Sequence, residues 1–262
     1  MGVYSKLVYL IDMDGTIYRG TCPIEYAKEF IRYLQQKNRI FFLVTNCPLN
    51  SAGALARKVQ GMRIDVGPGN IITSADVTAD YLVSSTSCSK AYVVGSDALK
   101  EKIAGRGIGI VSEGPDCVVV GYDTEFSYEK MKKATQFILD GAGFICTNGD
   151  STIPDGNKLV PHTGAIAASI ETASGTKPVV IGKPERYLLD TVSRRVKCKK
   201  EQFCVVGDRL DTDIYFGVKQ NILSFLVLTG VTTIDDLKKS NIQPTKVFNN
   251  LCELMLFDEE NN

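Results

Sequence analysis

Short apolar runs rich in β-branched residues alternate with amphipathic helical stretches along almost the whole chain, and this alternation constrains the fold most. The runs are Leu7–Ile11, Ile40–Val44, Ala91–Val94, Cys117–Val120, Phe144–Thr147, Val179–Ile181, Phe203–Val206 and Leu223–Leu228. The helical stretches include Ile24–Gln36, Tyr128–Leu139, Gly164–Ala173 and Glu185–Val196. In these stretches apolar residues recur at spacings of three and four. Strands that alternate with helices predict βαβ units, and therefore an α/β fold whose parallel sheet is covered by helices on both faces.

The middle of the chain carries its own alternation of strands and helices. This segment opens after a small polar run, Ser84–Ser89, and is long enough to have its own core. We therefore expect residues 81–177 to form a second α/β domain inserted into the first. The flanking residues 1–80 and 178–262 would then close one sheet around the insertion.

The balance of charges argues against some classes of partner. Lysine plus arginine and aspartate plus glutamate both number 30, so there is no electrostatic case for binding nucleic acid or a membrane surface. The N-terminal segment lacks the apolar stretch of a signal peptide. The eight cysteines are scattered without a CxxC pair. This pattern is typical of reduced core residues in a cytoplasmic protein, rather than of a disulfide framework or a zinc site.

Two of the predicted strands end in aspartates. Asp12 and Asp14 follow the first run, and Asp208 and Asp213 follow the run Phe203–Val206. The carboxyl ends of parallel strands are where open α/β folds bind ligands, and carboxylate oxygens from two loops suit magnesium. Neither pair is specific by itself, because the first is also typical of a turn and Asp213 is also typical of a helix N-cap.

Two further strand ends carry groups that suit a phosphate. Thr45 and Asn46 offer a hydroxyl and an amide after the second run, although they also fit a helix N-cap. Lys183 follows Val179–Ile181, where a buried ammonium would neutralise paired carboxylates or a phosphoryl group. A solvated loop lysine is the alternative. Because all four elements lie at carboxyl ends of predicted parallel strands, one cleft could hold them together.

This combination resembles the haloacid dehalogenase-like superfamily, and its order and spacing resemble the subgroup of NagD-like and p-nitrophenyl phosphatases. The matching motifs are Asp12-x-Asp14-Gly15-Thr16, Thr45-Asn46, Val120-Gly121-Tyr122-Asp123, Thr147-Asn148-Gly149-Asp150, Gly164-Ala165, Gly182-Lys183-Pro184 and Gly207-Asp208-Arg209-Leu210-Asp211-Thr212-Asp213-Ile214. The resemblance covers nearly the whole chain and implies a Rossmann-like parallel sheet core with an inserted α/β cap. The chain departs from the pattern at Cys47-Pro48-Leu49, Gly149 and His162, which affects what can be said of the substrate.

The resemblance implies a magnesium-dependent phosphomonoester hydrolase that works through an aspartyl-phosphate on a small phosphorylated metabolite. The compound p-nitrophenyl phosphate would be an artificial substrate. Asp12 would be the nucleophile, and Asp14 would be held protonated as the general acid and later act as the base. Mg²⁺ would be bound by Asp12, Asp208 and the backbone carbonyl of Asp14. Asp213 would orient the waters of the metal.

The remaining roles implied by the resemblance concern the phosphate and the leaving group. Thr45, Asn46 and Lys183 would bind the phosphate. The cap would exclude water and recognise the leaving group. The cap residues expected nearest the substrate are Asn148, Asp150 and His162. His162 is not needed as a base, so it is expected to face solvent or to touch the substrate.

Two alternatives to a phosphatase stay open. A phosphomutase would use the same site and retain the phosphate on an isomer of the substrate. A catalytically idle regulatory protein would use the same scaffold, although the complete set of motif residues argues against it. Relatives in the subgroup commonly dimerise through the cap, so a homodimer is also expected.

Overall fold

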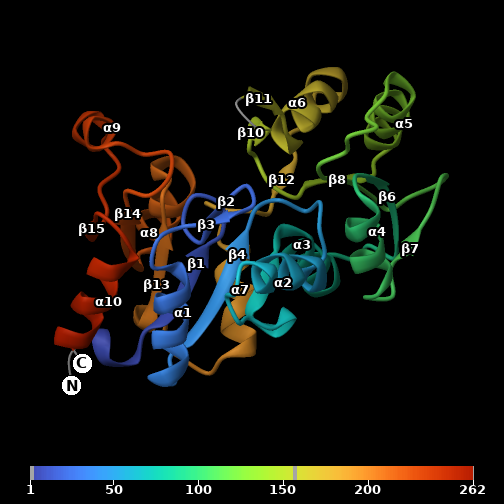
Figure 1. The fold of residues 1–262 in the computed structure, drawn as a ribbon. Helices are drawn as coiled ribbons and strands as arrows, with labels where there is room; N and C mark the ends of the chain where they lie inside the picture. Colours follow the sequence, from blue (N-terminus) through green and yellow to red (C-terminus); the bar gives the residue numbers. More distant parts are fainter. Residues whose placement is uncertain (1–2, 156–157, 262) are drawn as a thin grey trace.

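The computed structural model describes residues 3–155 and 158–261, so the first two residues of the N-terminal segment lie outside the described part. A six-stranded sheet forms the centre of the larger unit (Figure 1). Its strands in spatial order are β15 (Lys246–Phe248), β14 (Leu223–Val227), β13 (Phe203–Gly207), β1 (Val8–Asp12), β4 (Ile40–Thr45) and β5 (Ile71–Thr73). All the pairings are parallel, so the carboxyl ends of these strands meet at one edge.

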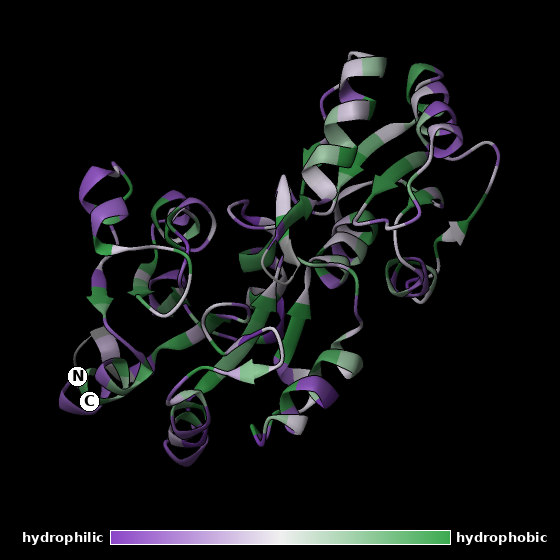
Figure 2. Ribbon diagram, turned by 45° about the horizontal axis from the view of Figure 1, so that its top comes forward, coloured by the Kyte–Doolittle hydropathy of each residue, from purple (hydrophilic) through white to green (hydrophobic). Residues whose placement is uncertain are grey.

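Helices cover both faces of this sheet. One face is covered by α1 (Ala27–Gln36), α2 (Ala52–Gly61) and α10 (Leu251–Glu260). The other face is covered by α3 (Ser74–Ser85), α7 (Tyr187–Arg195) and α8 (Tyr215–Gln220), while α9 (Ile234–Lys239) is largely exposed. Along β1, Tyr9 and Ile11 pack into the first layer and Val8 and Leu10 into the second, as the alternation of a strand requires. Figure 2 shows hydrophobic strands between helices with hydrophilic outer faces.

A second sheet of five parallel strands lies beside the first, in green and yellow at the upper right of Figure 1. Its order is β12 (Val179–Val180), β9 (Gly143–Cys146), β8 (Cys117–Val120), β6 (Lys90–Val94) and β7 (Gly109–Ile110). Helix α4 (Asp97–Ala104) covers one face, and α5 (Tyr128–Leu139) and α6 (Thr163–Ser174) cover the other. Strands β10 (Thr152–Asp155) and β11 (Lys158–Pro161) form a separate antiparallel hairpin.

The expected α/β architecture with a parallel sheet is confirmed, but one strand assignment was wrong. Val179–Ile181 was expected in the first sheet. Instead Val179 pairs with Ile145 and Val180 with Cys146, which places β12 in the second sheet. The second sheet therefore extends past the predicted boundary at residues 177 and 178, because an apolar run does not reveal which sheet it joins. The division into two domains stays a prediction.

The two sheets are joined by packing between α3 and α4. One hydrophobic cluster contains Leu10 of the first sheet, Leu82 of α3, Leu99 of α4 and Val119 of the second sheet. Ion pairs reinforce this junction: Lys102 Nζ lies 2.6 Å from Asp76 Oδ1, and Asp80 pairs with Arg106. The second sheet is thus attached through a shared core as well as through the chain itself. None of the described helices is long and apolar enough to cross a membrane.

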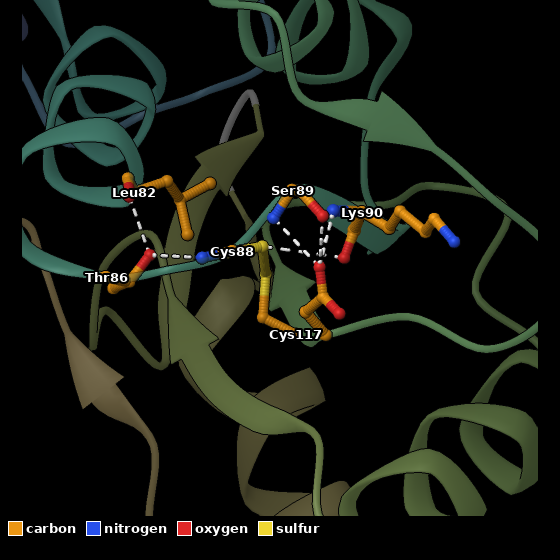
Figure 3. The surroundings of a disulfide bond; sticks show 7 residues. Leu82, Thr86, Cys88, Ser89, Lys90 and Cys117 are labelled. Carbon is orange, nitrogen blue, oxygen red and sulfur yellow. Dashed lines mark hydrogen bonds between the residues drawn. A yellow bond between two sulfur atoms is a disulfide. The ribbon is translucent and has the colours of Figure 1, made fainter.

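A disulfide between Cys88 and Cys117 corrects the expectation that all eight cysteines are reduced (Figure 3). Cys88 lies in the segment from α3 to β6, 29 residues before Cys117 at the start of β8, and pairing of β6 with β8 brings their Cα atoms to 6.2 Å. The same segment is held by Asp116, whose Oδ2 accepts bonds from Ser89 N, Ser89 Oγ and Lys90 N at 2.8–2.9 Å. The other six cysteines, all within the described ranges, are free.

Candidate active site

The carboxyl edge of the first sheet brings Asp12, Lys183 and Asp213 into direct contact. Asp12 ends β1, Lys183 follows β12, and Asp213 lies in a π-helical turn, Leu210–Ile214, after β13. Lys183 Nζ donates to Asp12 Oδ1 at 2.5 Å and to Asp213 Oδ1 at 2.6 Å, and the lysine side chain is only 3% exposed. The structure therefore brings these three residues together, even though β12 belongs to the other sheet.

Lys183 is held as an ammonium ion by its two carboxylate partners. Burial lowers the pKa of Lys183, but Asp12 and Asp213 raise it by more, so the net shift is upward. Burial and the neighbouring Asp213 raise the pKa of Asp12 well above its ordinary value, against the opposing effect of Lys183. One ammonium is therefore not enough to balance the negative charge of this site.

A third carboxylate, Asp208, completes an acidic cluster that fits a divalent cation. Oxygen atoms of Asp12, Asp208 and Asp213 lie within 4.8 Å of one another. Asp208 Oδ2 accepts a bond from Val231 N at 2.6 Å, whereas its buried Oδ1 has no hydrogen-bond partner among the described residues. Burial and Asp213 raise the pKa of Asp208 to about 6. A buried, unpartnered carboxylate oxygen beside two others is what a hard cation such as Mg²⁺ would satisfy.

The loop after β1 packs tightly against Asp208. Gly15 has a φ of +84°, and a Cβ atom at this position would lie 2.8 Å from Asp208 Oδ1. The loop returns through a short hairpin of β2 (Tyr18–Arg19) and β3 (Cys22–Pro23). Glycine is therefore required both by the left-handed backbone and by the lack of room.

Asp14 is exposed and is not part of the acidic cluster. The surrounding protein desolvates its carboxyl group and raises its pKa, while Lys58 and Arg19 act in the opposite direction. Lys58 Nζ sits 3.8 Å from the ring centroid of Tyr18 beside this loop. An exposed carboxyl group with a raised pKa suits a proton donor to a leaving group.

Thr45 ends β4 and Asn46 follows it, but the Asn46 side chain is already engaged. Asn46 Oδ1 accepts a bond from Lys183 N at 2.8 Å, and Nδ2 donates to Lys183 O at 3.0 Å. Thr45 Oγ1 accepts a bond from Cys47 N at 3.1 Å. The N-cap of α2 is Ser51, so the alternative interpretation of Thr45 and Asn46 as a helix cap is wrong.

Of the three cap residues, Asp150 reaches the site, whereas Asn148 and His162 are buried beside it. Asn46 Nδ2 donates to Asp150 Oδ1 and Oδ2 at 3.3 and 3.2 Å. Asn148 is 0% exposed; it donates to Asn46 O at 2.8 Å and its Oδ1 lies 3.2 Å from His162 Nδ1. These contacts hold the loop after β9, and the expectation that Asn148 lies near the substrate stays a prediction.

His162 does not face solvent, so the first of the two expected placements is wrong, and contact with the substrate stays a prediction. Its side chain is only 1% exposed, and its ring lies 4.6 Å from that of Tyr122. Burial lowers the pKa of His162 to about 4, so the ring is neutral near pH 7. Its Nε2 has no hydrogen-bond partner within residues 3–155 and 158–261.

Arg209 supports the site, although no role was predicted for it from the sequence. Its guanidinium donates to both carboxylate oxygens of Asp211, at 3.0 and 2.7 Å, and its backbone N–H donates to Asp213 Oδ2 at 3.2 Å. Asp213 lies inside the turn Leu210–Ile214, and the N-cap of α8 is Ile214, so this aspartate is not a helix N-cap. The position of Arg209 directly after Asp208, in the motif Gly207-Asp208-Arg209, was the sequence signal that could have indicated this role. The helical stretch predicted at Glu185–Val196 begins at Tyr187 instead, after a cis Lys183–Pro184 bond.

Comparison with known proteins places these residues in a family. A model of haloacid dehalogenase-like hydrolases matches residues 9–109, and a HAD-hydrolase-like model matches residues 180–254. The acid sugar phosphatase of Staphylococcus aureus is 37% identical over 246 residues, which cover 94% of this chain and 95% of that protein.

Solved structures of similar proteins point to the same family. A 4-nitrophenylphosphatase from Thermotoga maritima has a TM-score of 0.93 and 36% identity, with 98% and 99% of the two chains covered. NagD from Escherichia coli has a TM-score of 0.88 and 32% identity, with 94% and 97% covered. A glycerol phosphate phosphatase from Mycobacterium tuberculosis, solved in complex with magnesium, has a TM-score of 0.88 and 30% identity, with 97% of this chain and 78% of that chain covered. The chain therefore belongs to the haloacid dehalogenase-like hydrolases, and within them it is a phosphatase of the group that includes NagD and the p-nitrophenyl phosphatases.

Proposed function

We propose that the protein is a magnesium-dependent phosphomonoester hydrolase that acts on a small phosphorylated metabolite through an aspartyl-phosphate on Asp12. The observation that carries this proposal is the buried Lys183 ammonium between Asp12 and Asp213, next to the unpartnered Asp208 Oδ1. A fixed positive charge beside a carboxylate at a sheet edge is suited to bringing a phosphate to a nucleophile.

Asp12 and Asp14 would divide the chemistry. A carboxylate oxygen of Asp12 forms the new bond to phosphorus while the bond from phosphorus to the leaving oxygen breaks. Asp14 gives its proton to that oxygen. Asp14 then takes a proton from a water molecule that attacks phosphorus, which releases phosphate and restores the Asp12 carboxylate. The raised pKa of Asp14, its exposure, and its place two residues after Asp12 support this role.

The acidic cluster supports a bound Mg²⁺ held by Asp12, Asp208 and the backbone carbonyl of Asp14, with Asp213 orienting its waters. When bound, the ion would supply positive charge that offsets the carboxylates and the incoming phosphate. Lys183 neutralises part of the same charge and binds a phosphate oxygen. Thr45 offers its hydroxyl to a second phosphate oxygen. The side-chain amide of Asn46 instead forms hydrogen bonds with Lys183 and Asp150.

The substrate is proposed to be a small phosphate ester, with p-nitrophenyl phosphate as an artificial substrate. This follows the names of the relatives, which include an acid sugar phosphatase and a 4-nitrophenylphosphatase. Phosphate release should be measured across sugar phosphates, nucleotides, phosphoglycolate, pyridoxal phosphate and p-nitrophenyl phosphate. Release from at least one ester is expected. Retention of the phosphate on an isomer would identify a phosphomutase, and no release from any of them would favour an idle scaffold.

Metal dependence is tested separately. EDTA should abolish turnover and Mg²⁺ should restore it, because the acidic cluster needs a cation to tolerate a phosphate dianion. Ca²⁺ should inhibit, since its larger and looser coordination shell misplaces Asp12. Full activity in EDTA would contradict the metal site.

We further propose that the protein works in the cytoplasm as a homodimer formed through the second sheet. The six free cysteines support a reducing compartment, although the disulfide removes part of that argument. Two apolar side chains on α5, Tyr128 and Leu139, are 70% and 59% exposed and would suit a dimer contact. The balanced charge supports neither nucleic acid nor a membrane as a partner. Light scattering after size exclusion would test the dimer.

A further inference from the structure

We propose that Asp150 and Asn46 form a positioning pair, through which the loop after β9 fixes the backbone of Lys183 and so places its ammonium against Asp12. This inference rests on the proposed function of the site. It gives Asp150 a part in the chemical step with every substrate, rather than a part in choosing among substrates. It also gives the Asn46 side chain a task other than binding phosphate.

The carboxamide of Asn46 is the centre of this arrangement. Its Oδ1 accepts from Lys183 N at 2.8 Å and its Nδ2 donates to Lys183 O at 3.0 Å, so both backbone groups of one residue are held by one planar amide. The second hydrogen of Nδ2 points to the Asp150 carboxylate, at 3.2 and 3.3 Å from its two oxygens. Asp150 reinforces the amide orientation that the two bonds to Lys183 require, because a flipped amide would direct Oδ1 both at a carboxylate and at Lys183 O.

The neighbouring residues leave Asn46 little room to move. A Cβ atom on Gly182 would lie 2.6 Å from Asn46 Oδ1 and 2.8 Å from Asn148 Cβ. Glycine is therefore needed for the amide to approach the chain beside Lys183. Asn148 also donates from Nδ2 to the backbone carbonyl of Asn46 at 2.8 Å. Two residues of the loop after β9 thus hold Asn46, one through its side chain and one through its backbone.

The consequence for the reaction follows from the contacts of Lys183. Its Nζ lies 2.5 and 2.6 Å from two carboxylates, so a small shift of its backbone changes both distances. A misplacement of about 1 Å in an active site can lower the rate about 100-fold. If Asp150 acts through Asn46 on Lys183, its loss should lower kcat by a similar factor for every substrate and leave KM little changed.

The experiment compares Asp150→Ala with Asp150→Asn on p-nitrophenyl phosphate and on the best metabolite found in the substrate panel. The alanine variant should lose about 10- to 100-fold in kcat on both substrates. The asparagine variant keeps an oxygen that can accept from Asn46 Nδ2, so its kcat should stay within about threefold of the wild type. Should the alanine variant fail to fold, Asp150→Ser replaces it, because the serine hydroxyl is too short to reach Asn46.

A double-mutant cycle tests whether Asp150 acts through Asn46. The variant that combines Asn46→Ala with Asp150→Ala should be no slower than Asn46→Ala alone, since both changes release the same lysine. Asp123 is a matched control, because its partners are Glu125 N in the loop from β8 to α5 and Lys130 Nζ of α5. Asp123→Ala should leave kcat on p-nitrophenyl phosphate unchanged.

The outcomes separate this inference from the proposed function. An absence of phosphate release by the wild-type protein would defeat the proposed function itself. With an active wild type, the inference is overturned by any of three results: losses that differ strongly between the two substrates, no rescue by Asp150→Asn, or losses that multiply in the double variant.

Discussion

At the scale of single residues, Asp12 and Asp14 make different contacts and should fail in different ways. Asp12→Asn keeps an oxygen for Lys183 but removes the attacking carboxylate, so the protein should fold and turnover should vanish. Asp14→Asn keeps the nucleophile but loses the proton donor and the later base, which should slow both steps by about 10²- to 10⁴-fold.

The two variants should differ in whether they accumulate the aspartyl-phosphate intermediate. Since p-nitrophenolate needs little protonation to leave, Asp14→Asn should slow the second step more and accumulate phosphate on Asp12. Intact-mass spectrometry after an acid quench would detect this phosphate, and peptide mapping would locate it. Phosphate on another residue, or near-normal turnover by Asp12→Asn, would refute the assignment of the nucleophile.

His162 should make the folded protein sensitive to mild acid. Burial lowers its pKa from 6.5 to about 4, so between these values the unfolded chain binds a proton that the folded protein does not. The free energy of unfolding should therefore fall as the pH drops below about 6.5. One group with this shift contributes a loss of roughly 2 kcal/mol by pH 5 and nothing above pH 7.5.

The measurement is urea unfolding of the wild type and of His162→Asn at pH 7.5 and pH 5. The asparagine variant has no group that titrates at this position, and its amide can still donate to Asn148. Its stability should fall less between the two pH values than that of the wild type. Equal losses in the two proteins would mean that His162 is protonated as easily in the folded state as in the unfolded one.

At the scale of helices and strands, the sequence predicted eight strands of the two parallel sheets, but not all of their partners. The run Cys117–Val120 and the helix Tyr128–Leu139 match β8 and α5 residue for residue, because their patterns are local. The sheet that β12 joins, and the disulfide of Cys88, depend on residues far away in the sequence. The short strands β5 and β15 were not predicted, because three residues are too few to show the alternation of a strand.

The same division between local and distant signals applies to the site. The placement of Asp12, Asp208 and Asp213 at one edge follows from strand ends, which are local features. The engagement of Asn46 by Asp150 joins residues 104 positions apart, and nothing in the sequence around either one indicates it.

The disulfide between Cys88 and Cys117 should stabilise the protein measurably. It closes a loop of 29 residues between the segment after α3 and β8, which in the chain-entropy model is worth about 3–4 kcal/mol. Reduction should therefore lower the Tm of the wild type. The variant with Cys88→Ala and Cys117→Ala should resemble the reduced wild type and should not respond to a reductant. A wild type whose Tm is the same with and without reductant would show that the bond contributes nothing.

At the scale of the whole molecule, the two sheets share a hydrophobic core, and this bears on the predicted domains. The cluster that contains Leu10 and Val205 of the first sheet continues through Leu82 to Leu99 and Ile103 of α4. Asp80 of α3 pairs both with Arg106 on the side of the second sheet and with Arg194 of α7. Unfolding of the second sheet alone would expose this shared surface of α3 and break these contacts.

The molecule should therefore unfold in a single cooperative transition. Scanning calorimetry should give equal calorimetric and van't Hoff enthalpies, the signature of two-state behaviour. Leu99→Ala, at the junction, and Ile138→Ala, on the far face of the second sheet, both remove buried side chains. Each should cost about 2–5 kcal/mol and move the same single transition. Two resolved transitions, with Ile138→Ala shifting only one of them, would show instead that residues 81–177 behave as an independent domain despite the shared core.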